Sequence, residues 1–507
     1  MKLQSAVHFF SLGAAVLAAL QVDLDSPDSI KDAAQQVAAD LMGFYHGNEP
    51  GQTPGILPGP PPDGDYYWWL GGALWGTMLD YWHYTGDDTY NFLVNQSLLH
   101  QSGPNRDFLD PNWTASTGND DQSFWGMSAM LAAEVNFPDP PKDNPQWLAL
   151  AQAVWNEQTS EDRRNSSLCG MGLRWQMFPQ NKGYDYKNAI ANVAFLNIGA
   201  RLARYTNNQT YVKWCEDTWN WLTDYLIVDD QYNVYDGIHW TFGPEPEHQL
   251  DCSSRNNAQF SYSAAALIQG VANLYNFTNG DAKWGRRLEG LVNQTLSYFA
   301  PDGYLVENTC EYTNTCTTDM TSFKGYVHRW LAQTTQLAPF TFPRIFPVLK
   351  SSARAAADHC TEGDNGRMCT FSWIPDSADK STGACQQMNV LGALSSLLVE
   401  AARAPVTNST GGTSQGDPNA GSAKPSLHPR LHDIRTIDRV GGAFITAAIA
   451  LAVSGTFLWM SWESGPSYRR RSFGLQESYE LDAITPKRNK LLRRPVGHRL
   501  PSEVTAD

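Results

Sequence analysis

The sequence predicts a mainly α-helical body in which six helical hairpins close into a toroid. Apolar residues recur at helical spacing, as in 196–203 and 264–271, whereas strand-like alternation is scarce. Three helices also end in the same phrase, an aromatic residue followed by a polar turn and the start of another helix, at 84–90, 205–211 and 277–284. These repeated turns indicate helices that pack in pairs.

The first helix of each pair sets the number of hairpins. Such helices are predicted to begin near Trp68, Asn119, Lys187, Asn256, Thr321 and Ala384, at intervals of 51 to 69 residues. An open solenoid is the alternative, but solenoids keep a more regular period. A closed toroid leaves a cleft lined by the first turns of the inner helices and by the loops before them.

Composition is consistent with one large folded body. The chain has 507 residues, of which 42% are hydrophobic and 12% aromatic, and this excludes the disordered and fibrous classes. The net charge is −15, with nine Lys/Arg and six acids in 463–507 and −19 in the first 403 residues. A protein that binds nucleic acid needs a basic face, so nucleic acid is not an expected partner. The acidic body and basic tail indicate two compartments.

The two ends predict passage through a membrane. Residues 1–20 resemble a signal peptide, with Lys2, an apolar run and small residues before a polar stretch. Residues 440–462 carry no charge, contain two tryptophans at their end and precede three arginines, as expected for a membrane-spanning helix. Residues 463–507 would then be a cytoplasmic tail. A glycolipid-anchor signal is the competing interpretation, but such a signal ends in its apolar segment.

The segment between these ends is predicted to lie outside the cytoplasm at the cell surface. Residues 21–403 form the predicted domain, and 404–439, rich in Ser, Thr, Gly and Pro, a solvated stalk. Eight cysteines lie in the domain, and disulfides fit them better than zinc, with Cys310/Cys316 and Cys360/Cys369 as nearby pairs. Seven Asn-x-Ser/Thr sites, beginning at Asn95, agree with this location.

Two adjacent acids, Asp120 and Asp121, carry the strongest chemical signal. They lie in the first turn of a predicted helix, where a capping role alone would explain them. However, aromatic residues crowd the neighbouring segments, and sugar rings stack on such side chains, here Trp68, Trp69, Trp125 and Trp175. Two neighbouring carboxyl groups can divide the work of glycoside cleavage, one as nucleophile and the other as proton donor.

The segment 119–125, Asn-Asp-Asp-Gln-Ser-Phe-Trp, resembles the signature of glycoside hydrolase family 76, the endo-α-1,6-mannanases, and especially its fungal branch. Similarity extends over 25–403 and includes 68–75, 173–176, 187–192, 322–325 and 386–389. The resemblance implies an (α/α)6 barrel, retention of anomeric configuration, Asp120 as nucleophile and Asp121 as acid/base. The chain departs from the family at Tyr262-Ser263-Ala264-Ala265, where members often read Tyr-Asn-Gln-Gly.

Other side chains are weaker candidates for sugar binding. Asp319 is either a sugar ligand or a helix cap, and Asn188 either binds a hydroxyl or joins two helices. Lys324 either meets a charged glycan or lies on a solvated helix face. Tyr262 belongs to the segment that differs from the family. No metal cluster or cofactor motif is found, so none is predicted.

The predicted function is a monomeric, membrane-tethered enzyme that cleaves or transfers α-1,6-linked mannose chains of the cell wall. Hydrolysis and transfer share one intermediate, and the sequence does not separate them. The fungal branch is thought to attach glycolipid-anchored mannoproteins to wall glucan, which makes transfer a serious option. A tethered glycan-binding protein without turnover is the alternative from another class.

Overall fold

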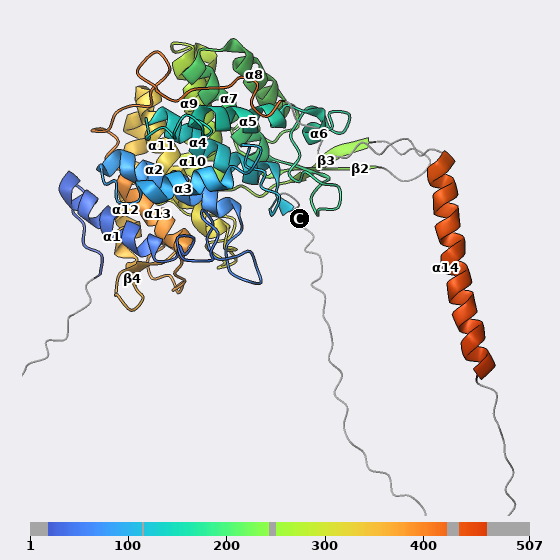
Figure 1. Ribbon diagram of the computed structural model, residues 1–507. Coiled ribbons are helices and arrows are strands. Elements are labelled where there is room, and N and C mark those ends of the chain that lie inside the picture. The colour runs from blue at the N-terminus through green and yellow to red at the C-terminus, as the bar shows by residue number, and fades with distance from the viewer. Residues whose placement is uncertain (1–18, 114–115, 243–249, 423–435, 464–507) are drawn as a thin grey trace, which may run out of the picture. The chain divides into compact units, whose positions relative to one another are not determined.

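The computed structural model of the chain describes residues 19–113, 116–242, 250–422 and 436–463 (Figure 1). The predicted signal peptide up to residue 18 and the predicted tail from residue 464 lie outside these residues. The chain divides into two units, 1–430 and 431–507.

Six described helices form the inner ring of the first unit: α2 (Trp69–Thr85), α4 (Asn119–Glu134), α7 (Ala189–Thr206), α9 (Ser261–Phe277), α11 (Phe323–Leu337) and α13 (Ala384–Ser396). Each packs against the next, and α13 packs against α2, so the ring is closed. The predicted starts agree with these helices, the largest difference being the five residues between Asn256 and Ser261. The closed toroid, rather than an open solenoid, is therefore confirmed for these residues.

The outer helices cover this ring. They are α3 (Asn91–Gln101), α5 (Trp147–Gln158), α8 (Gln209–Asp224), α10 (Ala282–Phe299) and α12 (Phe342–Asp358), and each packs on the inner helix that precedes it; α6 (Glu161–Arg164) is a single turn. The sixth outer position is occupied by α1 (Pro27–Met42), which packs on α13. The last pair therefore joins the beginning of the domain to its end.

The inner and outer helices differ in how much of their surface is buried, because the inner helices are covered by the outer ones. In α10, the buried side chains Trp284, Leu288, Leu291, Thr295 and Phe299 recur every three or four residues, as in an amphipathic helix. In α4, nearly every residue is buried, so the helix is surrounded by protein. Small residues allow these inner helices to approach closely. A Cβ added at Gly72 would lie 3.0 Å from Trp125.

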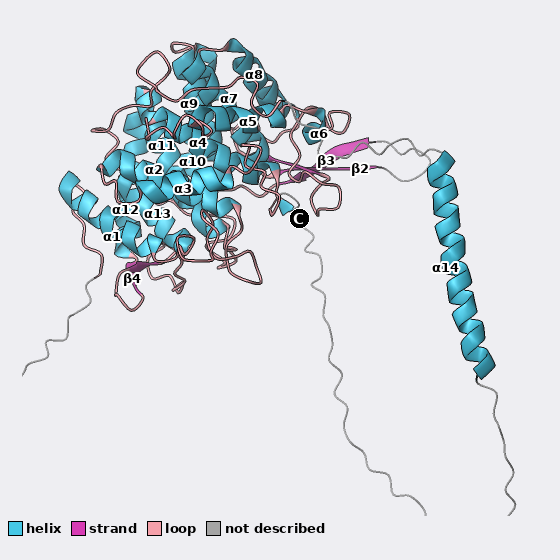
Figure 2. Ribbon diagram, in the orientation of Figure 1, coloured by secondary structure: helices cyan, strands magenta, loops and turns pink. Residues whose placement is uncertain are grey.

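Short strands, which the sequence analysis did not predict, accompany the helices (Figure 2). Strands β1 (Tyr186–Asn188), β2 (Gly237–Phe242) and β3 (Leu250–Asn256) form an antiparallel sheet in that order. Strands β4 (Cys360–Glu362) and β5 (Met368–Cys369) form a second pair. Because β1 leads directly into α7, it fixes the residues that begin this inner helix.

Three disulfides are present among the described residues. Cys310–Cys316 and Cys360–Cys369 confirm the predicted nearby pairs, and Cys169–Cys252 ties β3 to the segment before β1. Cys215 and Cys385 are buried free thiols, so disulfides do not account for all eight cysteines. Both lie on ring helices or their partners, where a thiol packs as a small apolar group.

Residues 404–422 pack on the toroid, which differs from the predicted solvated stalk. The Val406 N–H donates to the Glu134 carbonyl at 2.8 Å, and the Leu148 N–H donates to Ser414 Oγ at 3.0 Å. Asn156 Nδ2 donates to the Ala420 carbonyl at 2.7 Å. Composition did not predict this, because a polar segment without hydrophobic periodicity can still be held by hydrogen bonds to a folded surface.

The second unit contains α14 (Thr436–Glu463), which covers the predicted membrane span at 440–462. Within the part of the chain that the structure describes, no helix is both long and apolar enough to cross a membrane. The predicted span is therefore not confirmed.

A buried ion pair joins α4 to α7 and provides a test of the ring. Arg201 Nη2 lies 2.6 Å from Glu134 Oε2, and both side chains are almost completely buried. We expect Arg201→Met to lower the free energy of unfolding by about 3–5 kcal/mol, because Glu134 would remain buried without its partner. The double variant Arg201→Met/Glu134→Gln should lose less than the single variant. Urea denaturation measures both; a double variant less stable than Arg201→Met would contradict the argument.

Candidate active site

The first turns of five inner helices, including that of α2 at Trp69, surround a cavity of about 380 Å³, here called the Asp120 cavity. Asp120 and Asp121 come from α4, Asn188 precedes α7, Tyr262 lies in α9 and Phe323 begins α11. Side chains far apart in the sequence meet here because the six inner helices begin at the same end of the ring.

A second cavity of about 420 Å³ adjoins the first and is here called the Trp68 cavity. Its lining includes the aromatic side chains of Tyr67, Trp68 and Trp113 and the polar side chains of Thr117 and Gln176. Four residues border both cavities: Trp69, Asp121, Trp175 and Asp319. Asp121 therefore lies where the two cavities meet.

The first turn of α4 fixes the two acids in the cavity wall. Asp121 Oδ2 accepts a hydrogen bond from the Gly118 N–H at 2.7 Å, so Asp121 also caps the helix. Asp120 Oδ1 accepts from the Asp121 N–H at 3.0 Å, and Asp120 Oδ2 accepts from Asn188 Nδ2 at 3.1 Å. Asp121, rather than Asn119 or Asp120, thus caps the helix, and both acids still face the cavity.

A buried polar cluster also holds the first turn of α4 in place. The Asn119 N–H donates to the Trp175 carbonyl at 2.8 Å, and Asn119 Nδ2 donates to the Arg174 carbonyl at 2.8 Å. Arg163 Nη1 donates to Asn119 Oδ1, and Arg163 pairs with Glu157 at 3.2 Å. Because these contacts fix the first turn of α4, the two carboxyl groups have little freedom to move.

Most of the predicted sugar-binding residues lie in these cavities. Trp69, Trp175, Asn188, Tyr262 and Asp319 border the Asp120 cavity. Trp68 borders only the Trp68 cavity, and its Nε1 donates to Gln101 Oε1 at 2.8 Å. The ring of Tyr262 stacks on Phe323 with centroids 3.8 Å apart, so these two side chains form an aromatic wall.

Trp125 does not lie in either cavity, so its prediction as a sugar contact is wrong. It is fully buried and stacks between Trp68 and Phe108, with ring centroids 5.2 and 5.7 Å away. In α4 it packs against α2, where a Cβ added at Gly72 would lie 3.0 Å from its side chain. Residue type and proximity in sequence could not distinguish this packing role from stacking on a sugar.

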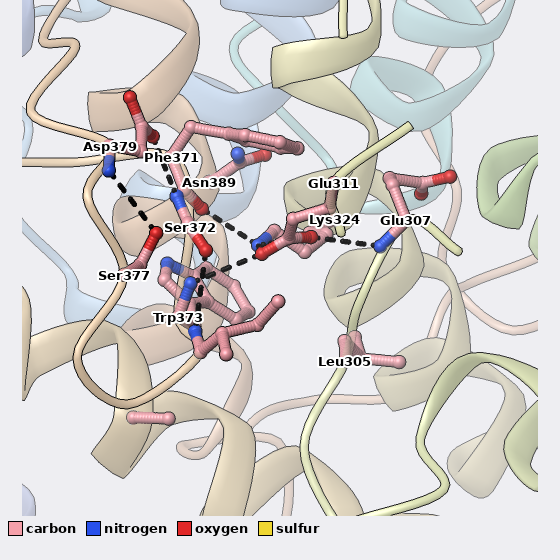
Figure 3. A network of polar contacts seen from close by, with 12 residues as sticks. Leu305, Glu307, Glu311, Lys324, Phe371, Ser372, Trp373, Ser377, Asp379 and Asn389 are labelled. Atoms are coloured by element: carbon pink, nitrogen blue, oxygen red, sulfur yellow. Dashed lines mark hydrogen bonds and ion pairs between the residues drawn. The ribbon is translucent and has the colours of Figure 1, made fainter. Parts of the chain in front are cut away.

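Lys324 is also not a sugar contact, and it is not on a solvated helix face. Its side chain is completely buried, and Nζ lies 3.0 Å from Glu311 Oε1 (Figure 3). Nζ also donates to the Phe371 carbonyl at 2.7 Å. Neither alternative that the sequence suggested for Lys324 is therefore correct.

Asp236, which no sequence pattern indicated, precedes β2 and also borders the Asp120 cavity. Asp236 Oδ2 accepts from the Tyr186 hydroxyl at 2.6 Å and from Asn256 Nδ2 at 2.9 Å. These partners come from β1 and β3 of a sheet that was not predicted, so no sequence signal linked them. Among the described residues, no group of His, Cys, Asp and Glu is arranged to hold a metal ion.

Comparison with known proteins agrees with this geometry. Residues 29–409 match the model of glycosyl hydrolase family 76, which covers both cavities and the whole ring. The chain belongs to glycosyl hydrolase family 76. It is therefore a glycoside hydrolase, as the signature at 119–125 indicated.

Fungal members of family 76 are similar over most of the chain. The mannan endo-1,6-alpha-mannosidase DCW1 of Saccharomyces cerevisiae is 40% identical over 87% of this chain and 95% of its own length. The mannan endo-1,6-alpha-mannosidase DFG5 of the same yeast is 38% identical, over 87% and 94%.

Solved structures share the fold. The crystal structure of Dfg5 from Chaetomium thermophilum, determined in complex with glucosamine, is 51% identical, has a TM-score of 0.74 and covers 80% of this chain and 98% of that one. The GH76A alpha-1,6-mannanase from Salegentibacter is 16% identical, with a TM-score of 0.55 and coverage of 73% and 99%.

Burial controls the protonation of the acids in the family 76 cleft. It raises the pKa of Asp121 to about 6, although the Gly118 N–H favours the ionised form. Burial and the charge of Asp121 raise the pKa of Asp120 well above its usual range. The same two causes raise the pKa of Asp319 to about 7. At mildly acidic pH, Asp120 and Asp121 are therefore not both ionised.

Asp319→Asn should make the melting temperature less dependent on pH. The folded pKa of about 7 lies above the value of about 3.9 for an unfolded Asp, so this group favours folding fully below about pH 4. That contribution is lost as the pH rises through about 7. The melting temperature of the variant should therefore fall less than that of the wild type between about pH 4 and pH 7. Asp302→Asn, at an exposed position, is the control and should keep the wild-type slope.

Proposed function

We propose that this chain is a retaining enzyme that acts within α-1,6-linked mannose chains. The observation that carries the proposal is that Asp120 and Asp121 lie side by side in one cavity and that Asp121 also borders the second. Adjacent carboxyl groups reach the separation of about 5–5.5 Å that retaining chemistry needs if their side chains diverge into one cleft. The mannan endo-1,6-alpha-mannosidases that cover this chain almost completely support the substrate.

Asp120 is the proposed nucleophile and Asp121 the proposed acid/base. Burial and the charge of Asp121 raise the pKa of Asp120 well above its usual range, which alone would leave the proton on Asp120. The hydrogen bonds favour the opposite order, since Asp120 accepts from two fixed donors and Asp121 from one. The hydrogen-bond donors decide which acid is ionised, because they remain in place when a sugar replaces water in the cleft.

The reaction then has two steps. A carboxylate oxygen of Asp120 forms a bond to the anomeric carbon while the glycosidic C–O bond breaks, and the proton of Asp121 passes to the leaving oxygen. In the second step Asp121 takes a proton from the acceptor, whose oxygen bonds to the anomeric carbon and releases Asp120. Water as acceptor gives hydrolysis, and a sugar hydroxyl gives transfer.

The cavity walls provide the proposed sugar contacts. Trp69, Trp175 and Tyr262 offer aromatic faces for stacking on pyranose rings. Asp319, Asn188 and the Asp236 that was missed offer acceptors or donors for hydroxyl groups. Trp68 would contact a sugar on the Asp121 side of the cleft.

Transfer is the second candidate, and the Trp68 cavity favours it. This cavity lies on the side of Asp121, where the acceptor must enter, and its aromatic lining suits a sugar. We propose that the domain works in the secretory pathway or at the cell surface, which three disulfides support.

Incubation of the protein with an α-1,6-mannan oligomer, followed by mass analysis of the products, tests the proposal. Shorter products indicate hydrolysis and longer products indicate transfer. Binding without any product would favour the glycan-binding alternative.

Asp121→Asn should lose activity on mannan but still react with a mannoside that has a good leaving group. The second step would be slow, because no base activates water, and azide should restore turnover. Acid and base catalysis is worth about 10²–10⁴-fold, so a loss of this size is expected on mannan. Asp120→Asn should block both steps and show no azide rescue. Full activity of Asp121→Asn on mannan would reduce Asp121 to a helix cap.

A further inference from the structure

A buried charged network lies beside the cleft and is not used by the proposed chemistry (Figure 3). Lys324 Nζ contacts both carboxylate oxygens of Glu311 at 3.0 and 3.1 Å. It also donates to the Phe371 carbonyl, and it lies 4.3 and 4.1 Å from the ring centroids of Phe371 and Trp373. A lysine that satisfies a carboxylate, a backbone carbonyl and two aromatic rings is held in one position.

Glu311 connects Lys324 to the loop that leads to Asp319, the third acid of the cleft. Its Oε2 accepts from the Glu307 N–H at 2.9 Å, and its Oε1 accepts from the Trp373 N–H at 3.2 Å. The Cys310–Cys316 disulfide closes the loop immediately around Glu311. The residues that follow, Thr317, Asp319 and Met320, line the Asp120 cavity.

Glu307 connects the network to the aromatic wall formed by Tyr262 and Phe323. Its carboxylate accepts from the hydroxyl and the N–H of Ser261, the first residue of α9. The next residue is Tyr262, which stacks on Phe323, and Phe323 is the neighbour of Lys324. Tyr262 and Phe323, whose rings stack, are therefore each adjacent in sequence to a residue of the buried network.

We propose that Lys324, through Glu311 and Glu307, is a positioning residue that holds the Tyr262–Phe323 wall and Asp319 in place for substrate binding. This proposal rests on the proposed function for the identity of the substrate. Its observable effect is on affinity, because Asp120 and Asp121 are held by a separate cluster around Asn119 and Arg163. Loss of the network should thus raise KM and leave kcat largely unchanged.

The main test is the double variant Lys324→Met/Glu311→Gln. It removes both charges while keeping similar volumes, and such replacements are often tolerated in a protein interior. We expect KM for the α-1,6-mannan oligomer to rise about tenfold and kcat to stay within about twofold, consistent with loss of ground-state and transition-state binding alike. Hydrogen exchange of the free protein should become faster in 305–322 and 260–264.

The matched control is Arg201→Met/Glu134→Gln, which removes another completely buried pair. Glu134 ends α4, about 20 Å along the helix from Asp121. This control should keep the wild-type KM and the wild-type exchange in 305–322. Equal KM values for the two double variants, or unchanged exchange in 305–322, would overturn the proposal.

The proposal can still be tested if the double variant does not fold or if the wild type is inactive on mannan. If Lys324→Met/Glu311→Gln does not fold, Ser261→Ala replaces it, because this change only breaks the link from Glu307 to α9, and the same two readouts apply. If the wild type does not act on α-1,6-mannan, the proposed function fails, while hydrogen exchange still decides whether the network positions the loop and the wall.

Discussion

The inner helices are buried on all sides, so their polar side chains can be satisfied only by neighbouring helices or at the helix ends. Between the helices, a polar contact links five of the six pairs of ring neighbours. Ser128 donates to the Gly72 carbonyl, Arg201 pairs with Glu134, Asn197 bonds to Gln269, Gln269 to Gln333, the Gly325 N–H to Asn389, and Arg329 to Asp80. Five of these contacts join consecutive helices, and Arg329–Asp80 joins α11 to α2 across the ring. Buried contacts of this kind tolerate few alternative arrangements, which gives the ring a unique register.

The same constraint explains the cleft at one end of the ring. First-turn N–H groups lack partners within their own helix, so carboxylates are stabilised there even when water is largely excluded. Asp121 uses this position to cap α4, and Asp120 lies beside it with Asn188 as a further donor. Burial then opposes the ionised forms and raises the pKa of Asp121 to about 6 and that of Asp319 to about 7, within the range in which proton transfer is useful.

The sequence predicted what depends on periodicity and on local motifs, and it failed where burial decides. The inner helices begin close to the predicted positions, because hydrophobic spacing and turn residues are local properties. Asp120 and Asp121 were found for the same reason. Trp125 and Lys324 were misjudged, since a tryptophan or lysine does not reveal from its neighbours in sequence whether it faces solvent. Asp236 was missed, because its partners come from strands of three to seven residues that have no clear alternation.

Under the proposed chemistry, the arrangement of the two cavities also bears on whether water or a sugar completes the reaction. Asp121 borders both cavities, so it can protonate a leaving group in the Trp68 cavity and then activate whatever replaces it there. Aromatic walls favour a sugar ring over water in that position, because stacking buries apolar surface that water leaves exposed. On the Asp120 side, Asp236 and Asn188 lie around the ring that becomes covalently attached, together with the aromatic side chain of Tyr262. Donor recognition thus combines hydrogen bonds with stacking, and the acceptor meets both kinds of contact as well, since Thr117 and Gln176 line the Trp68 cavity beside Trp68 and Trp113.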